Sequence, residues 1–204
     1  MQFHVFAKNA RCLRTDEQVE LLLAELDGVQ WDVLLISETW RVAKSEKWET
    51  SDGHLFAGSG GYDGSRGVAI MVHSKWVSGE CGFQAVDERV CSMDINCGGR
   101  RLRLISAYFP HSGYGDLPVE KCCATLRELH AEARRCKRST IMGGDFKAEI
   151  GSAREDAHYH PSLGVHGHPD RNSPGEMMRR WVTVEDLVVG NTHFEKPISD
   201  RWTH

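Results

Sequence analysis

Gly143-Gly144-Asp145-Phe146-Lys147-Ala148 is the stretch that decides how this chain folds and where its chemistry lies. It follows the apolar pair Ile141-Met142, which indicates a strand that ends at Asp145. A carboxylate at the end of a strand, followed by small residues, is how α/β enzymes present an acid to a metal ion or to an attacking water. The stretch therefore predicts an α/β fold with a reactive edge at Asp145.

Two other predicted strands carry a polar residue at a comparable place. Val33-Leu34-Leu35-Ile36 is a continuous apolar run, typical of a strand buried on both faces, and Glu38 follows it. A second apolar run, over 102–107, leads to Tyr108. Alone, each residue would be an ordinary solvated carboxylate or half-buried aromatic. Together the three strand ends carry polar residues that are suited to metal-assisted phosphodiester chemistry.

Composition favours an ordinary globular domain. The chain has 204 residues, 40% of them hydrophobic and 26% charged, which predicts a single domain over 1–204 with its own core. Seven cysteines without a Cys-x-x-Cys pair indicate reduced thiols in an intracellular protein, nuclear or cytoplasmic, and give no support to a zinc site. No stretch is long and apolar enough to predict a membrane span, and no obligate protein partner is evident.

The net charge of −4 argues against tight, non-specific binding of nucleic acid. Local basic clusters could still contact it. Two are visible in the sequence: Arg100, Arg101 and Arg103, and then Arg134, Arg135, Lys137 and Arg138. We interpret the second as the basic end of a helix.

The order of predicted elements mixes hairpins with crossovers. Thr15 with Gln18 forms a capping-box pattern that begins a helix, and Pro118 is well placed to begin another. Asn96-Cys97-Gly98-Gly99 predicts a hairpin turn. After a long loop over 151–172, Ser173 is expected to cap a helix and Leu187-Val188-Val189 to begin a strand. Such an order predicts a layered α/β fold.

Several short motifs, in one order along nearly the whole chain, resemble the endonuclease/exonuclease/phosphatase superfamily. Within it the chain is most similar to the endonuclease domains of non-LTR retrotransposons and to craniofacial-development-protein-like sequences. The motifs are Asn9-Ala10-Arg11, Leu35-Ile36-Ser37-Glu38-Thr39-Trp40, Ser106-Ala107-Tyr108-Phe109-Pro110-His111, Gly143-Gly144-Asp145 with the residues to Gly151, Arg171-Asn172 with Gly175, and Asn191-Thr192-His193-Phe194. The resemblance implies a four-layer α/β sandwich with its site at the rim where two sheets meet.

The resemblance also implies roles for single residues. It makes Glu38 the principal ligand of Mg²⁺, which Mn²⁺ could replace, with Asn9 and Asp145 beside it. Tyr108 would approach the scissile phosphate, and Asp145 would position or deprotonate the attacking water. The substrate-binding residues would be His111, Arg171, Asn172 and Asn191.

Two departures from the family pattern bear on activity. The residue two after Asp145 is normally Asn, and here it is Lys147, a candidate catalytic residue that brings a full charge. A dication and an ammonium group about 4 Å apart repel by on the order of 8 kcal/mol at an effective dielectric constant of 20. The family also ends in further strands with a Ser-Asp-His segment, which Ser199-Asp200-Arg201 does not match, so we expect a domain that lacks its last strands. Thr203 would begin a strand that is not completed.

The sequence thus supports one leading hypothesis and two alternatives. The first is a magnesium-dependent DNA endonuclease domain of retrotransposon type, impaired by Lys147 and the absent segment. The second is an inactive remnant or binding module of the same fold. The third is a phosphatase or lipid phosphodiesterase of the same superfamily, which would bind a specific small molecule instead of showing salt-sensitive DNA binding.

Overall fold

The computed structural model describes residues 2–111, 115–153, 161–168 and 170–195 of the chain. It divides the chain into two compact units. The first consists of Met1–Phe109 with Ala124–Asp145, and the second of Pro110–Cys123 with Phe146–His204. All the strands among these described residues belong to the first unit.

The first unit contains a five-stranded sheet of order β1-β2-β5-β4-β3. Its strands are β1 (Val5–Asn9), β2 (Val33–Ser37), β3 (Glu46–Glu49), β4 (Leu55–Ser59) and β5 (Val68–Val72). β1 runs parallel to β2, and the other neighbours are antiparallel. Every residue of β2 is buried, as its continuous apolar run predicted.

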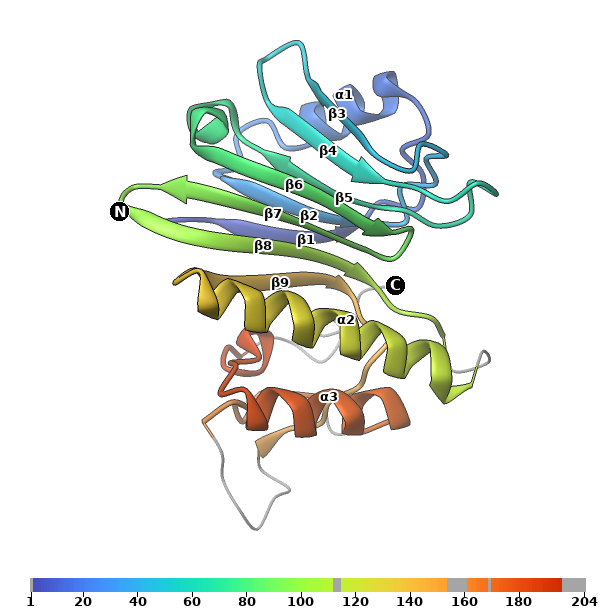
Figure 1. The fold of residues 1–204 in the computed structure, drawn as a ribbon, viewed down its shortest axis with the longest axis vertical. Coiled ribbons are helices and arrows are strands. Elements are labelled where there is room, and N and C mark those ends of the chain that lie inside the picture. Colours follow the sequence, from blue (N-terminus) through green and yellow to red (C-terminus); the bar gives the residue numbers. More distant parts are fainter. Residues whose placement is uncertain (1, 112–114, 154–160, 169, 196–204) are drawn as a thin grey trace. The chain divides into compact units, whose positions relative to one another are not determined.

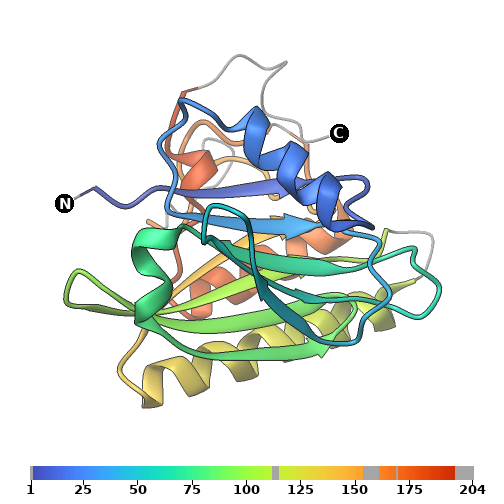
Figure 2. The ribbon, with the colours of Figure 1, turned by 90° about the horizontal axis from the view of Figure 1, so that it is seen from above.

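A second sheet of order β6-β7-β8-β9 lies against the first, and Figures 1 and 2 show the two packed face to face. Its strands are β6 (Glu80–Asp87), β7 (Val90–Cys97), β8 (Arg100–Tyr108) and β9 (Ser139–Asp145). The predicted Gly98-Gly99 turn joins β7 to β8. β9 returns parallel to β8, and this pairing places Asp145 opposite Tyr108.

Successive side chains of β2 pack into two different hydrophobic cores, one on each face of the first sheet. Val33 and Leu35 face the core between the sheets, whereas Leu34 and Ile36 pack with α1 (Asp16–Glu25) on the other face. Thr15 caps α1 with the predicted reciprocal capping box. Burial on both faces explains why β2 carries no polar residue before Ser37.

The end of α2 (Asp116–Arg135) that belongs to the first unit covers the second sheet. Arg103 of β8 is 6% exposed and donates to Asp94, to Glu132 of α2 and to the Leu129 carbonyl. The first unit therefore has the predicted order helix, sheet, sheet, helix. No helix in the described ranges is long and apolar enough to cross a membrane. Cys136 is exposed because it lies beyond the last helical turn.

The described residues of the second unit include α3 (Ser173–Val184) and the 3-10 turn η4 (Gly190–Thr192). The cap of α3 is Asn172 and not Ser173, because the Asn172 side chain accepts from the Gly175 amide. The strand predicted at 187–189 is wrong. The Leu187 and Val189 amides donate to the carbonyls of Val182 and Ser162, so this segment does not enter a ladder. Ser199, Asp200 and Thr203 lie outside the described residues.

The two glycines before Asp145 let β9 lie close to its neighbours. A Cβ atom at Gly144, where φ is +138°, would come within 1.9 Å of the Ala107 carbonyl oxygen. One at Gly143 would come within 2.7 Å of the Leu35 side chain, which belongs to the other sheet. The backbone contact requires glycine at position 144, whereas a side chain at position 143 would have to displace the end of the Leu35 side chain.

Candidate active site

Asn9, Glu38 and Asp145 meet at one end of the two sheets. Asn9 is the last residue of β1, Glu38 follows β2, and Asp145 is the last residue of β9. Parallel pairing of β1 with β2, and of β8 with β9, brings the carboxyl ends of these strands to the same edge. In Figure 2 this is the end toward which the β2 arrow points.

A single amide group joins the two carboxylates. Asn9 Nδ2 donates to Glu38 Oε1 at 2.7 Å and to Asp145 Oδ2 at 3.0 Å. Asn9 Oδ1 in turn accepts from the Arg11 backbone amide at 3.1 Å. Asp145 is only 6% exposed, so its carboxylate is held in a largely dehydrated position where these donors count most.

Glu38 is held by an unusual backbone. Its φ is +57°, in the left-handed region that L-residues seldom adopt. The next residue, Thr39, is buried, and its amide donates to the Gly67 carbonyl at 3.2 Å. Gly67 has to be glycine, because a Cβ atom there would lie 2.2 Å from Thr39 Oγ1. The left-handed turn therefore places the Glu38 side chain against Asn9, and the packing of Thr39 on Gly67 holds the turn in place.

Tyr108 lies beside Asp145 at the end of the second sheet. It is partly buried and packs against the core between the sheets. The Arg89 guanidinium lies 5.3 Å from the centre of its ring and donates to its carbonyl at 3.2 Å. Sequence analysis missed Arg89, because nothing near the β6–β7 turn indicates that it would meet Tyr108.

The donor set suits a hard divalent cation. Mg²⁺ prefers oxygen ligands, keeps several waters and needs only one or two carboxylates. The Glu38 and Asp145 carboxylates, joined through one amide, provide that set. Asn9 presents its nitrogen to them, so a bond from Asn9 to the metal would require its amide group to turn over. Among the described residues no group of three or more His, Cys, Asp or Glu forms a metal cage.

The other predicted site residues belong to the second unit. Asn172 joins two of its segments: its Nδ2 donates to the Lys147 carbonyl at 3.2 Å, and its Oδ1 accepts from Glu149 and Gly175. Arg171 is exposed and pairs with Glu176 at 3.3 Å. His111 and Asn191 are exposed. Their roles toward a substrate remain predictions.

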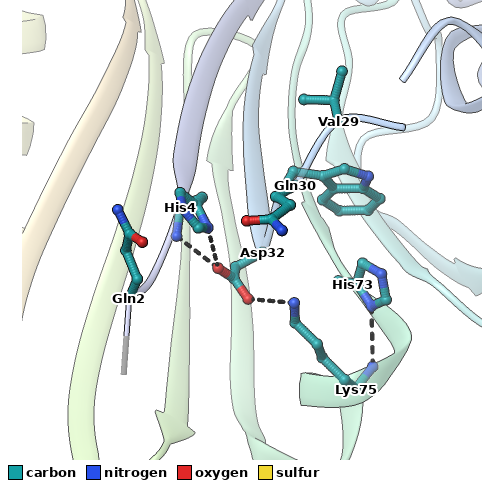
Figure 3. A pocket seen from close by; sticks show the side chains of 8 residues that line it. Gln2, His4, Val29, Gln30, Asp32, His73 and Lys75 are labelled. Carbon is teal, nitrogen blue, oxygen red and sulfur yellow. Dashed lines mark hydrogen bonds and ion pairs between the residues drawn. The ribbon is translucent and has the colours of Figure 1, made fainter. Parts of the chain in front are cut away.

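A separate hollow of about 450 Å³ lies at the opposite end of β1, β2 and β5 (Figure 3). Asp32, 2% exposed, is its buried centre and accepts from Lys75, Trp76 and the His4 amide at 2.6–2.8 Å. Burial would raise the pKa of this carboxyl, but those donors outweigh it and lower the pKa to about 2. The Asp32 carboxylate is thus ionised and fully hydrogen-bonded within the fold, which is a structural role. None of the predicted site residues lines this hollow.

No protein-family model matches the chain, and no curated protein matches it in sequence. Several solved structures match it in fold. AP endonuclease LMAP from Leishmania major aligns over 90% of the chain with a TM-score of 0.58 and 16% identity. The endonuclease domain of TRAS1, a telomere-specific non-LTR retrotransposon, aligns over 89% with a TM-score of 0.51 and 17% identity.

A third match is the 3'-5' exonuclease NExo from Neisseria meningitidis, which aligns over 92% of the chain with a TM-score of 0.51 and 18% identity. The chain spans 65%, 69% and 71% of the lengths of these three structures. Identities this low establish the fold alone. The chain therefore has the α/β fold of the endonuclease/exonuclease/phosphatase proteins, as the motifs around Glu38, Tyr108 and Asp145 predicted.

Proposed function

We propose that this chain is a magnesium-dependent phosphodiester hydrolase that cleaves DNA in the manner of a retrotransposon endonuclease domain. The observation that carries the proposal is the Asn9 amide, which joins the Glu38 and Asp145 carboxylates at the edge of the sheets. Solved structures of the same fold include nucleases that act on DNA, which supports the substrate class.

Each residue at this edge has a chemical task in the proposal. The Glu38 carboxylate would hold the metal, and Mg²⁺ or Mn²⁺ would neutralise charge on the phosphate oxygens. Asp145, buried and aligned by Asn9, would accept a proton from the attacking water. Tyr108, opposite Asp145 on β8, would donate a hydrogen bond to the phosphate.

The test is nicking of supercoiled plasmid with Mg²⁺ or with EDTA. We expect nicking by the unaltered chain in Mg²⁺ only, and a loss of at least about a hundredfold in Glu38→Gln. The matched control is Glu49→Gln, because Glu49 is an exposed carboxylate at the far end of β3 and should be dispensable. Circular dichroism would establish that each variant is folded.

Thermal unfolding adds a readout that does not need turnover. If Glu38 holds the metal, Mg²⁺ should raise the melting temperature of the unaltered chain and of Glu49→Gln, but not of Glu38→Gln. A folded chain with neither nicking nor a Mg²⁺-dependent shift would overturn the proposal in favour of an inactive binding module. A Mg²⁺-dependent shift without nicking would overturn DNA as the substrate and favour the phosphatase or lipid phosphodiesterase.

A further inference from the structure

The loops around the Glu38 end of the first unit form one connected surface, which we call the loop rim. It comprises residues 10–15, 38–45 and 60–67 and the turn at 88–89. Backbone hydrogen bonds join its parts: Leu13 to Thr39 at 2.8 Å, Trp40 to Arg66 at 2.6 Å, and Gly67 to Glu88 at 3.0 Å. Figure 2 shows these loops, in blue, cyan and green, at the same end of both sheets. Backbone hydrogen bonds therefore connect the loop rim to the residues on either side of the Glu38 turn.

In two pairs of residues on the loop rim, a cationic side chain lies over an aromatic ring. The Arg14 guanidinium lies 5.2 Å from the centre of the Trp40 ring, and the Lys44 ammonium lies 4.7 Å from that of Tyr62. These pairs lie on the loops that follow β1, β2 and β4. Such contacts are attractive and hold both partners in place.

Lys44 and Tyr62 are the most accessible of these pairs. Both are exposed, and Tyr62 is 79% exposed. Among the described residues Lys44 has no carboxylate within ion-pair distance, whereas Arg66 on the same loop as Tyr62 pairs with Glu88 at 2.7 Å. The pair thus offers an open aromatic surface and an ammonium group whose charge is not neutralised.

An exposed ring with an ammonium group over it, which no carboxylate of the described residues neutralises, matches the base and the phosphate of an unpaired nucleotide. A base stacks on the ring whatever its identity, while the cation contacts the neighbouring phosphate. A base inside a duplex is already stacked and cannot reach such a ring without being turned out. We propose that Lys44 and Tyr62 form a subsite for an unpaired nucleotide on the loop rim, so that the preferred substrate has single-stranded character. This rests on the proposed function of the Glu38 site.

Two residues of the basic clusters conspicuous in the sequence are neutralised by acidic partners. Arg103 and Arg138 both pair with Asp94, at 2.7 and 3.1 Å, and Arg103 also pairs with Glu132. Those charges hold the second sheet to α2. The loop rim instead keeps Arg11, Arg14 and Lys44 without a carboxylate partner among the described residues, close in sequence to Asn9 and Glu38.

The test is binding of a labelled ten-nucleotide oligothymidine, measured by fluorescence anisotropy in EDTA at low salt. Stacking on a ring contributes enough that Tyr62→Leu should raise the dissociation constant roughly five- to a hundredfold. Tyr62→Phe keeps the ring and should stay within about twofold. A ten-base-pair duplex should bind the unaltered chain and Tyr62→Leu equally. Lys44→Gln should lower the salt dependence for the single strand by about 0.7 in the logarithmic slope.

Two results would overturn the subsite: an unchanged single-strand affinity in Tyr62→Leu, or equal losses for single strand and duplex. Glu38→Gln separates this inference from the proposed function, because it should abolish nicking and leave oligothymidine binding intact. If the unaltered chain does not nick but Tyr62→Leu still loses single-strand binding, only the hydrolase proposal fails. If nicking is present and Tyr62→Leu binds normally, only the subsite fails.

Discussion

At the residue scale, two side chains define the chemistry that this edge can support. Asn9 uses one nitrogen to hold two carboxylates that would otherwise repel each other. Lys147 stands two residues after Asp145 and has a left-handed backbone, with φ of +49°. Asparagine tolerates that conformation far better than lysine and carries no charge. Lysine at this position therefore has a conformational cost, and it would add an electrostatic cost if a divalent cation bound at Asp145.

The first prediction follows from those two costs. Lys147→Asn should stabilise the chain by about 0.5–1 kcal/mol, because Asn relieves part of the left-handed strain. It should also raise Mg²⁺-dependent nicking, by roughly tenfold if the ammonium lowers metal affinity by about 1.4 kcal/mol. Urea denaturation and Mg²⁺ titrations of the nicking rate measure the two effects.

Lys137 offers a matched control, because it is exposed and has a φ of +54°. Lys137→Asn should gain similar stability with no change in activity. An active chain in which Lys147→Asn nicks no faster than Lys137→Asn would contradict the electrostatic part of the argument.

At the element scale, side-chain hydrogen bonds to the backbone fix where helices begin and hold loops in place. The capping box at Thr15 was predicted and is confirmed, because it depends only on residues three apart. The strand predicted at 187–189 is wrong, because a strand needs a neighbour and these amides bond to loop carbonyls. Asn172 does more than the sequence indicates: it caps α3 and also clamps the segment at Lys147–Glu149.

The second prediction separates the two tasks of Asn172. Asn172→Ala removes the cap and the clamp and should cost about 1–2 kcal/mol of unfolding free energy. Asn172→Asp keeps the acceptor for Gly175 and suits the helix dipole, but loses the donor to the Lys147 carbonyl. It should recover most of the stability while the amides around Glu149 exchange faster with solvent. Equal losses in both variants would show that capping is not the source of the stability.

At the scale of the whole molecule, acid stability depends on the end of the first unit opposite Glu38. His54 and His73 lie with ring centres 4.5 Å apart, and both pack against Trp31. Burial lowers the pKa of both imidazoles, and the pKa of His73 is lowered further by His54 and Lys75. Asp52 and Glu20 near His54, and Asp32 near His73, oppose this only in part.

The third prediction is a two-stage loss of stability in acid. Because the folded-state pKa of each histidine lies below its ordinary 6.5, their stability contribution is complete above pH 6.5 and is lost as the pH falls through the lowered values. Asp32, with a pKa of about 2, adds stability that is complete above pH 3.8 and is lost toward pH 2. Urea denaturation between pH 8 and pH 2 measures both stages.

The double variant His54→Gln with His73→Gln should flatten the stage below pH 6.5 and leave the stage below pH 4 in place. Nicking assays can accompany this at pH 7.5, where the variant should match the unaltered chain. A first stage that keeps its full size in the double variant would mean that other groups cause it.

Much of the fold followed from short-range patterns. The apolar run at Val33–Ile36, the Gly98-Gly99 turn and the cap at Thr15 each predict their element from neighbouring residues, and the structure has all three. Local rules work here because burial on two faces, a tight turn and a helix start each involve only a few successive residues. The motifs also identified Glu38, Tyr108 and Asp145 as residues at strand ends.

The sequence by itself determined several of the elements, the α/β class and the residue types at the candidate edge. Only the tertiary structure decided which of them meet. Asn9 reaches a partner 29 residues away and another 136 residues away, through a strand register that no local pattern specifies. Tertiary structure also decides which cations are neutralised. Arg103 and Arg138 form ion pairs with acidic residues on β7 and α2. Lys44 has no carboxylate partner among the described residues and lies over the Tyr62 ring. Which cations are neutralised depends on distances in space, and those distances exist only once the sheets have packed.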